Sequence, residues 1–152
     1  MTEKIDETDK KILNYMIKTN ETRHSKIAKK LKVTPTTIHK RIRKLKKIKA
    51  LNGLQPLIDL KKIGFDVTVI INAMASKGQL EEAAQKWAKE KNVCSVYRVT
   101  GKYDVVVIAK FKNTEELNEF NKRMVKDELI ERTNTSIVFQ TTKESPNPEE
   151  LY

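Results

Sequence analysis

Short hydroxyl side chains and long cations recur within the segment 34–49, which reads TPTTIHKRIRKLKKIK. At 100° per residue, six of them project from one side of a helix. They are Thr36, Thr37, Lys40, Arg43, Lys44 and Lys47. Threonine hydroxyls can meet base edges in the major groove of DNA, whereas lysine and arginine hold phosphates, and arginine also suits a guanine edge. The set therefore predicts a DNA-binding surface, with an ordinary solvated lysine face as the alternative.

The other side of this segment is apolar, which predicts the helix that positions these side chains. Ile38, Ile42 and Leu45 recur at helical spacing. Thr34 is a good N-cap, and Pro35 suits the first helical position, because its missing N–H would have no partner there. We therefore expect a helix that docks on a small core by one side.

Two further helices are expected before the basic one. Residues 6–19 predict an amphipathic helix with two aspartates in its first turn, and Ser25 is expected to cap a short helix over residues 26–31. This order predicts a helix-turn-helix, with a generic three-helix bundle as the runner-up. Ser25 and Thr34 stand at helix starts, where hydroxyl and amide groups can meet phosphate, so both join the predicted DNA contacts. Arg41, at the flank of the basic helix, is expected to pair with an acid of the first helix.

The excess positive charge is confined to the first third of the chain. Residues 1–52 hold 16 Lys+Arg and 5 Asp+Glu, whereas residues 53–152 hold 15 of each, so the net charge of +11 lies in the first part. A basic module beside a neutral one is typical of a polyanion binder. The 152 residues suffice for two small domains, and no apolar run approaches the roughly 20 residues of a membrane helix.

The rest of the chain repeats a strand–helix–strand pattern. Strands are expected at 67–75, 93–100, 103–111 and 131–142, and helices at 79–91 and 114–127. Gly101 and Lys102 are expected to form a two-residue turn. The fold class is therefore α+β: an N-terminal helix-turn-helix (winged-helix-like) domain and a C-terminal ferredoxin-like βαββαβ domain with an antiparallel sheet.

Two of the expected strands are apolar on both faces. Residues 105–109 are continuously apolar and residues 67–71 nearly so, which indicates burial on both sides. Two helices on one face leave the other face bare, and the basic module is too polar to cover it. A second copy of the sheet would cover it in a two-fold dimer, which also suits two DNA half-sites.

These patterns divide the chain into four expected parts. Residues 1–52 form the helix-turn-helix DNA-binding domain, 53–64 a linker with a short strand, 65–142 the dimerisation and effector domain, and 143–152 a polar C-terminal tail.

Several chemistries are not expected. Cys94 is the one cysteine, so we expect a reducing, cytoplasmic compartment, and the polar, acidic start of the chain is not a signal peptide. Both histidines, His24 and His39, lie in the first part, away from that cysteine, so neither a metal nor a cofactor is expected. Neither a nucleophile with a base nor a carboxylate pair at useful spacing stands out, so an enzyme is not expected.

Four motifs run along nearly the whole chain: DETDKKIL at 6–13, SKIAKKL at 25–31, DLKKIGF at 59–65 and TGKYD at 100–104, the most specific. Together with the basic helix, they resemble the Lrp/AsnC, or feast/famine, family of bacterial and archaeal transcription regulators, and we expect an archaeal source. The resemblance implies a sequence-specific regulator of double-stranded DNA. It also implies a sheet-to-sheet homodimer that often assembles into tetramers or octamers. Many family members sense a small molecule, usually an amino acid, near the TGKYD turn at a contact between dimers.

The residues around that turn fit an amino-acid effector. Gly101 lets the backbone turn and exposes amide groups, Tyr103 follows it, and Asp104 could pair with an α-ammonium group. Thr133 and Thr135, on one face of the last strand, could donate hydroxyl contacts to a carboxylate. A plain hairpin turn without a ligand is the alternative.

Other functions remain as alternatives. A DNA-architectural protein with little sequence specificity and no effector would need the same basic helix. Only the ratio of the affinities for a specific site and for random DNA would distinguish it from a sequence-specific regulator. RNA is disfavoured, because the sheet lacks the aromatic pairs that stack on bases. A branch that resembles this family decarboxylates sirohaem derivatives with histidines of its sheet domain, and this chain has none there.

Overall fold

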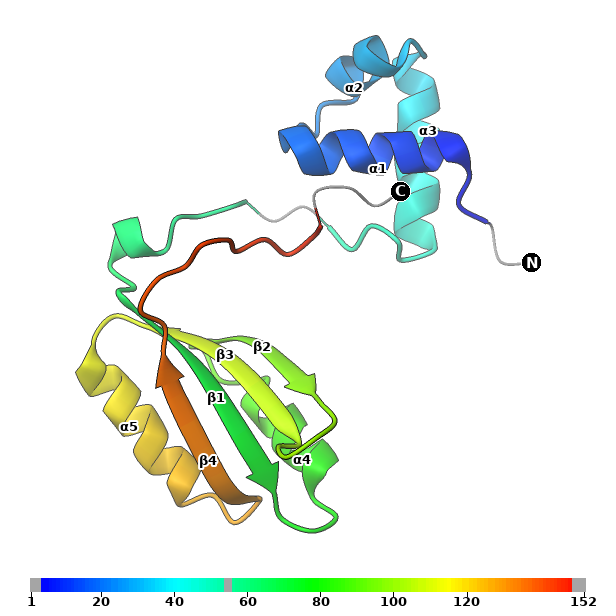
Figure 1. The fold of residues 1–152 in the computed structure, drawn as a ribbon. Helices are drawn as coiled ribbons and strands as arrows, with labels where there is room; N and C mark the ends of the chain where they lie inside the picture. The colour runs from blue at the N-terminus through cyan, green and yellow to red at the C-terminus, as the bar shows by residue number, and fades with distance from the viewer. Residues whose placement is uncertain (1–3, 54–55, 149–152) are drawn as a thin grey trace. The chain divides into compact units, whose positions relative to one another are not determined.

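The structure, a computed structural model, describes residues 4–53 and 56–148. The chain groups into two compact units: the chain up to Leu57 with the segment that begins at Lys143, and Ile58–Thr142. Figure 1 shows the helices of the first unit and the sheet of the second. In neither described stretch is a helix long and apolar enough to cross a membrane.

Three helices form the N-terminal unit, in the order that the sequence predicts. They are α1 (Glu7–Thr19), α2 (His24–Leu31) and α3 (Pro35–Lys47). A capping box starts α1: the Asp6 carboxylate accepts from the backbone N–H groups of Thr8 and Asp9, and the Asp9 carboxylate accepts from that of Asp6. The predicted helix-turn-helix is confirmed.

One small apolar core holds these helices together. It comprises Ile12, Met16, Ile27, Ala28, Ile38 and Ile42, with Tyr15, Leu31, Val33 and Leu51 packed against it. The three fully buried isoleucines come one from each helix, so each helix depends on the other two for its burial. Burying each such side chain stabilises the unit by about 1.5–3 kcal/mol, which holds α3 at its crossing with α2.

The second helix starts earlier than expected. Its N-cap is Arg23, whose side chain makes no capping hydrogen bond, and Ser25 lies exposed within the first turn. The expectation that Ser25 caps this helix is therefore wrong. Instead, the carboxylate of Glu21 accepts from the backbone N–H groups of Thr22 and Arg23. A carboxylate suits the positive end of the helix dipole better than a neutral hydroxyl does.

The linker contains no strand within residues 53 and 56–64, so this expectation is wrong for its described part; residues 54–55 lie outside the description. A 3₁₀ turn, η1 (Lys61–Ile63), forms instead and ends at Gly64, whose φ of 91° favours glycine. Leu57 and Ile58 remain exposed. A strand needs a neighbouring strand for its hydrogen bonds, and the sheet of this chain offers none here.

The C-terminal unit is a four-stranded antiparallel sheet with two helices. Its strands are β1 (Val67–Ala75), β2 (Val93–Arg98), β3 (Val105–Phe111) and β4 (Ile130–Ile137), and its helices are α4 (Leu80–Trp87) and α5 (Thr114–Val125). The strand order is β2-β3-β1-β4, with every neighbouring pair antiparallel. Both helices lie against the same face of the sheet (Figure 1). The predicted ferredoxin-like arrangement is confirmed.

Two elements, α4 and β4, end at least four residues earlier than the sequence pattern suggests. Helix α4 stops at Trp87, because the next turn tightens into hydrogen bonds such as that from Glu90 N–H to the Trp87 carbonyl. Strand β4 stops at Ile137. One more bond, from Val138 N–H to Thr68 O at 2.8 Å, reaches the beginning of β1, and beyond that point β1 offers no further partner.

The core of this unit lies between the sheet and the helix layer. Val69 and Val107 of the sheet belong to one buried cluster with Trp87 of α4, and the rings of Phe111 and Phe120 approach to 5.2 Å. The spacing of apolar residues in the two helices correctly predicts which helix side chains pack against the sheet.

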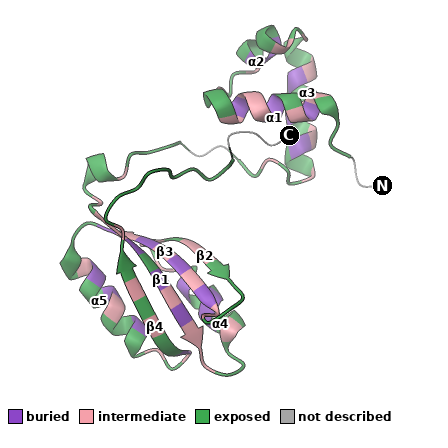
Figure 2. Cartoon of the chain, in the orientation of Figure 1, coloured by how far each residue is buried: buried purple, intermediate pink, exposed green. Residues whose placement is uncertain are grey.

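The other face of the sheet is partly exposed. Along β3, fully buried residues alternate with half-buried ones such as Val106 and Ile108, as Figure 2 shows. Ile70 of β1 and Tyr97 of β2 share this face and are exposed. Within one protomer, therefore, these strands are buried on one side only, although their sequences are apolar on both.

The connection between β2 and β3 is longer than the predicted two-residue turn. The ladder ends at Arg98 opposite Val105, and the backbone N–H of Val99 then donates to Asp104 O at 2.9 Å. Residues 100–103 form the loop, and Gly101 adopts φ 110°. The backbone of Asp104 is already hydrogen-bonded to Val99 and to Ala73 of β1. Asp104 therefore extends the hydrogen bonding beyond the ladder, and the chain reverses direction within residues 100–103.

Candidate nucleic-acid interface

The start of α3 is fixed by its own threonines. Thr34 Oγ1 accepts from the backbone N–H of Thr37 at 3.1 Å, and the two hydroxyl oxygens lie 2.9 Å apart. Pro35 occupies the first helical position. The Thr34 hydroxyl is therefore used inside the helix cap, and the Thr37 hydroxyl has one partner already.

An exposed stripe runs along the solvent side of α3. Its members are Thr36, Lys40, Arg43 and Lys47, all exposed. Among the residues that the structure describes, the side chains of Lys40 and Arg43 form neither a hydrogen bond nor an ion pair. The solvent stripe, as we call these four residues, thus offers a hydroxyl near the helix start and cations along its length, which suits base edges and phosphates respectively.

Two cations of α3 turn instead to the start of α1. Lys44 Nζ lies 2.6 Å from Asp9 Oδ2 and 2.8 Å from Lys4 O, and only 20% of the Lys44 side chain is exposed. Arg41 binds the Asp6 carboxylate and lies 3.2 Å from Asp9 Oδ1. We call Asp6, Asp9, Arg41 and Lys44 the α1–α3 bridge. It confirms the expected pairing of Arg41 with an acid of the first helix.

The bridge is strongly ionic. The hydrogen bond from Arg41, aided by the backbone N–H of Asp9, lowers the pKa of Asp6 to about 2. The Asp9 side chain is completely buried and satisfied by three donors: Asp6 N–H, Lys44 and Arg41. The sequence pattern did not reveal that Lys44 also belongs here, because on the helix surface it lies only 40° from Lys40 at 100° per residue.

The opposite flank of α3 meets α2. The rings of His24 and His39 are 5.4 Å apart in an edge contact. Glu21 binds Arg23 and lies 3.1 Å from Lys26 Nζ, and the hydrogen bond from Arg23 lowers the pKa of Glu21 well below its ordinary value. Ser25 is exposed and follows His24 in the first turn of α2.

In the second unit, the predicted effector residues have structural partners. Asp104 Oδ2 accepts from Ala75 N–H at 3.0 Å, and its backbone N–H donates to Ala73 O at 2.9 Å. Asp104 therefore ties the start of β3 to the end of β1. Gly101 is exposed, and Lys102 Nζ lies 5.6 Å from the ring centre of Tyr103.

Thr133 and Thr135 lie on the far side of β1 from that loop. They pair with Ala73 and Ile71, so their side chains share the helix-covered face, where Thr135 donates to Asn121 of α5. The backbones of Thr133 and Asp104 are about 10 Å apart, at two strand spacings. Within a single chain, β1 therefore lies between the two threonines and the TGKYD turn.

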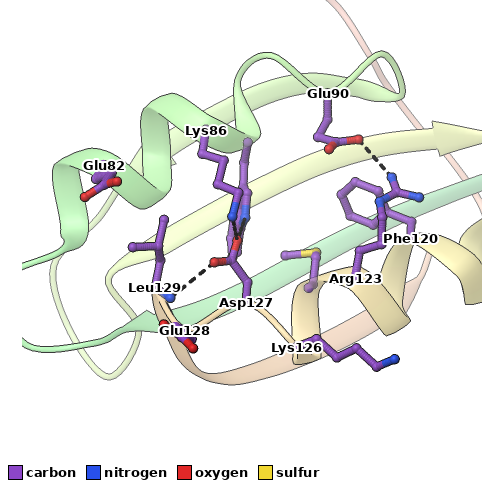
Figure 3. A pocket seen from close by; sticks show the side chains of 11 residues that line it. Glu82, Lys86, Glu90, Phe120, Arg123, Lys126, Asp127, Glu128 and Leu129 are labelled. Carbon is purple, nitrogen blue, oxygen red and sulfur yellow. Dashed lines mark hydrogen bonds and ion pairs between the residues drawn. The ribbon is translucent and has the colours of Figure 1, made fainter.

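A groove of about 630 Å³ lies elsewhere, between α4 and α5 (Figure 3). Four of its charged residues form two ion pairs: Lys86 with Asp127 at 2.9 Å, and Arg123 with Glu90 at 2.9 Å. Burial opposes ionisation of Asp127, but hydrogen bonds from Lys86, the Leu129 backbone N–H and Trp87 lower its pKa overall. The groove contains none of the predicted site residues, and its ion pairs join the two helices.

Comparison with known proteins covers both units. Residues 5–48 match the family described as winged helix-turn-helix DNA-binding, and residues 68–148 match the Lrp/AsnC ligand binding domain. The chain is 39% identical over 140 residues to an uncharacterised HTH-type transcriptional regulator of Pyrococcus abyssi, a match that spans 92% of this chain and 95% of that protein. It is 34% identical to the HTH-type transcriptional regulator FL11 of Pyrococcus horikoshii, over 93% of each chain.

Among solved structures, the chain is similar to AsnC of E. coli. The TM-score is 0.83 at 25% identity, and the match covers 95% of this chain and 99% of the other. The likeness therefore extends over both units.

Proposed function

Because the chain belongs to the Lrp/AsnC family of DNA-binding transcriptional regulators, we propose that it binds double-stranded DNA as a symmetric dimer and reads two half-sites with two copies of α3. The observation that carries this proposal is the solvent stripe. It is exposed, and its helix is held from behind by the core and from one flank by the α1–α3 bridge. A rigid helix with a hydroxyl near its start and cations along its length suits the major groove.

We assign different tasks to the predicted contacts. Thr36 and Thr37 stand where the helix start would enter the groove, and we propose that they meet base edges. Lys40 and Lys47 would hold phosphates, and Arg43 either a phosphate or a guanine edge. Ser25 and Thr34 would flank a phosphate at the starts of α2 and α3, with the Thr34 hydroxyl still capping its helix.

The partly exposed sheet face supports the dimer. Ile70, Tyr97, Val106 and Ile108 form an apolar surface on the side that the helices leave bare. A second copy of the same face would complete its burial and would present two DNA-binding units, as two half-sites require.

An amino-acid effector is the finer part of this proposal. In the part of the chain that the structure describes, Asp104 Oδ1 accepts no hydrogen bond, so it can still receive an α-ammonium group. Gly101 and Tyr103 would complete the site from the loop. Since Thr133 and Thr135 lie across β1, they would take part only through another protomer, which suits a site between dimers.

The experiment is a selection from random duplex DNA at near-physiological salt. A palindromic motif with half-sites about 10 base pairs, or a multiple, apart supports a dimeric regulator. If the recovered pool stays random while binding is tight and steeply salt-dependent, the chain is an architectural coat, and the dimeric reader is wrong. In either outcome we propose action by binding alone, because the helix-turn-helix holds both histidines and the sheet none.

A further inference from the structure

Lys44 and Lys40 are close neighbours on α3, yet their surroundings differ completely. Lys40 is exposed and, within the described residues, has no acidic partner. The Lys44 ammonium group touches Asp9 at 2.6 Å and lies 4.0 Å from Asp6. What distinguishes them is therefore the start of α1, which lies beside one lysine and not beside the other.

The Asp9 carboxylate lies directly beside the Lys44 ammonium group, at 2.6 Å. Its two oxygens receive Lys44, Arg41 and the Asp6 N–H, so no accepting oxygen is left without a donor. The carboxylate is completely buried, and removing one partner of a buried ion pair leaves an uncompensated charge. The Lys44 ammonium group already donates to Asp9 Oδ2 and to Lys4 O, which leaves at most one of its three N–H donors for a DNA phosphate.

We propose that Asp9 is a positioning residue that withholds Lys44 from DNA and so restricts the DNA footprint of α3 to the solvent stripe. Asp6 supports it by holding Arg41 on the same side. The bridge thereby sets how many phosphates each subunit neutralises. It limits sequence-independent attraction while leaving base contacts unchanged, so it favours discrimination between sites. This inference rests on the proposed DNA binding by α3.

The test measures the salt dependence of DNA binding for four variants of the full chain. The matched pair is Lys40→Met and Lys44→Met, because both remove an ammonium group and keep the apolar stem. Loss of one phosphate contact reduces the slope of log K against log salt by about 0.9 per subunit. We expect this reduction for Lys40→Met and an unchanged slope for Lys44→Met.

The second pair releases Lys44. In Asp9→Asn, the freed ammonium group can reach phosphate, so the slope should steepen by about 0.9 per subunit. For a dimer this is roughly a tenfold greater loss of affinity between 50 and 200 mM salt. The double variant Asp9→Asn/Lys44→Met should return to the wild-type slope. A merely structural role of Asp9 would not produce this reversal.

Each possible result supports or contradicts the proposed role of Asp9. If Lys44→Met reduces the slope as much as Lys40→Met does, Lys44 contacts phosphate and the proposal is wrong. A folded Asp9→Asn protein with the wild-type slope also overturns it. If circular dichroism shows that Asp9→Asn does not fold, the two lysine variants decide alone. If wild-type protein does not bind DNA, or Lys40→Met leaves its slope unchanged, the proposed interface itself fails. That result is distinct from a failure confined to Lys44.

Discussion

At the scale of single residues, the first turn of α1 does two tasks with two aspartates. Asp6 caps the helix and binds Arg41, whereas Asp9 completes the capping box and binds Lys44. Capping needs only an accepting oxygen, but the bridge needs a negative charge. The two tasks can therefore be separated by replacing Asp6 with asparagine, which caps equally well.

We predict that Asp6→Asn lowers the free energy of unfolding of the N-terminal unit by about 1 kcal/mol at pH 6, because a half-exposed ion pair and a favourable helix-dipole charge are lost. The pKa of Asp6 is lowered from 3.8 to about 2 in the folded chain. Its charge therefore stabilises the fold fully above about pH 4, and this contribution disappears as the pH falls through about 2.

Chemical denaturation, followed by helical circular dichroism at several pH values, measures this difference. Asp6→Ala is the control, because it removes the cap together with the charge and should remain destabilised at pH 2. A difference between wild type and Asp6→Asn that persists undiminished at pH 2 would contradict the charge argument.

At the scale of elements, α3 depends on packing rather than on intrinsic helix stability. An isolated helix of 13 residues is marginal in water, and α3 lies on a small core by one narrow stripe. Ile38, Ile42 and Leu45 are the residues that bury this stripe. The exposed cations therefore hold their positions only while these three side chains are packed.

Ile42→Ala should destabilise the N-terminal unit by roughly 2–5 kcal/mol, through lost burial and the cavity that remains. Because the sheet unit has a separate core, its own unfolding should not change. Backbone amide signals of α1–α3 and of the sheet, recorded by NMR during thermal unfolding, follow the two units separately. Simultaneous loss of both sets of signals would mean that the units do not fold independently.

At the scale of the whole molecule, the two units divide the proposed work. One presents the solvent stripe, and in our proposal the other would bring two copies of it together through its bare sheet face. Binding two half-sites with one dimer raises affinity by a factor of about 10²–10⁴ over a single unit, because the second contact becomes intramolecular. In the proposed dimer, the apolar side chains of the sheet would therefore influence DNA binding without touching DNA.

We expect Ile70→Lys, in the middle of the bare face, to produce monomers and to weaken binding to a palindromic site by at least about 100-fold. The lysine would be solvated in a monomer but would be buried without a partner in a dimer. Asn118→Lys adds the same charge to an exposed position on α5 and should remain dimeric. Sedimentation velocity and DNA titration provide the two readouts, and a dimeric Ile70→Lys protein would rule out this face.

The local sequence pattern was sufficient to predict most of the secondary structure of this protein. The spacing of Ile38, Ile42 and Leu45, the Thr34 cap and the two strand–helix–strand repeats predict most of the elements and the basic side of α3, since each depends on residues a few positions apart. Contacts between distant segments could not be predicted in this way. Whether a lysine of α3 is free or paired depends on α1, more than 30 residues earlier, so Lys40 and Lys44 look alike in sequence and differ in the fold. Likewise, the strand order places β1 between Asp104 and Thr133, and this order depends on pairing between strands far apart in the sequence.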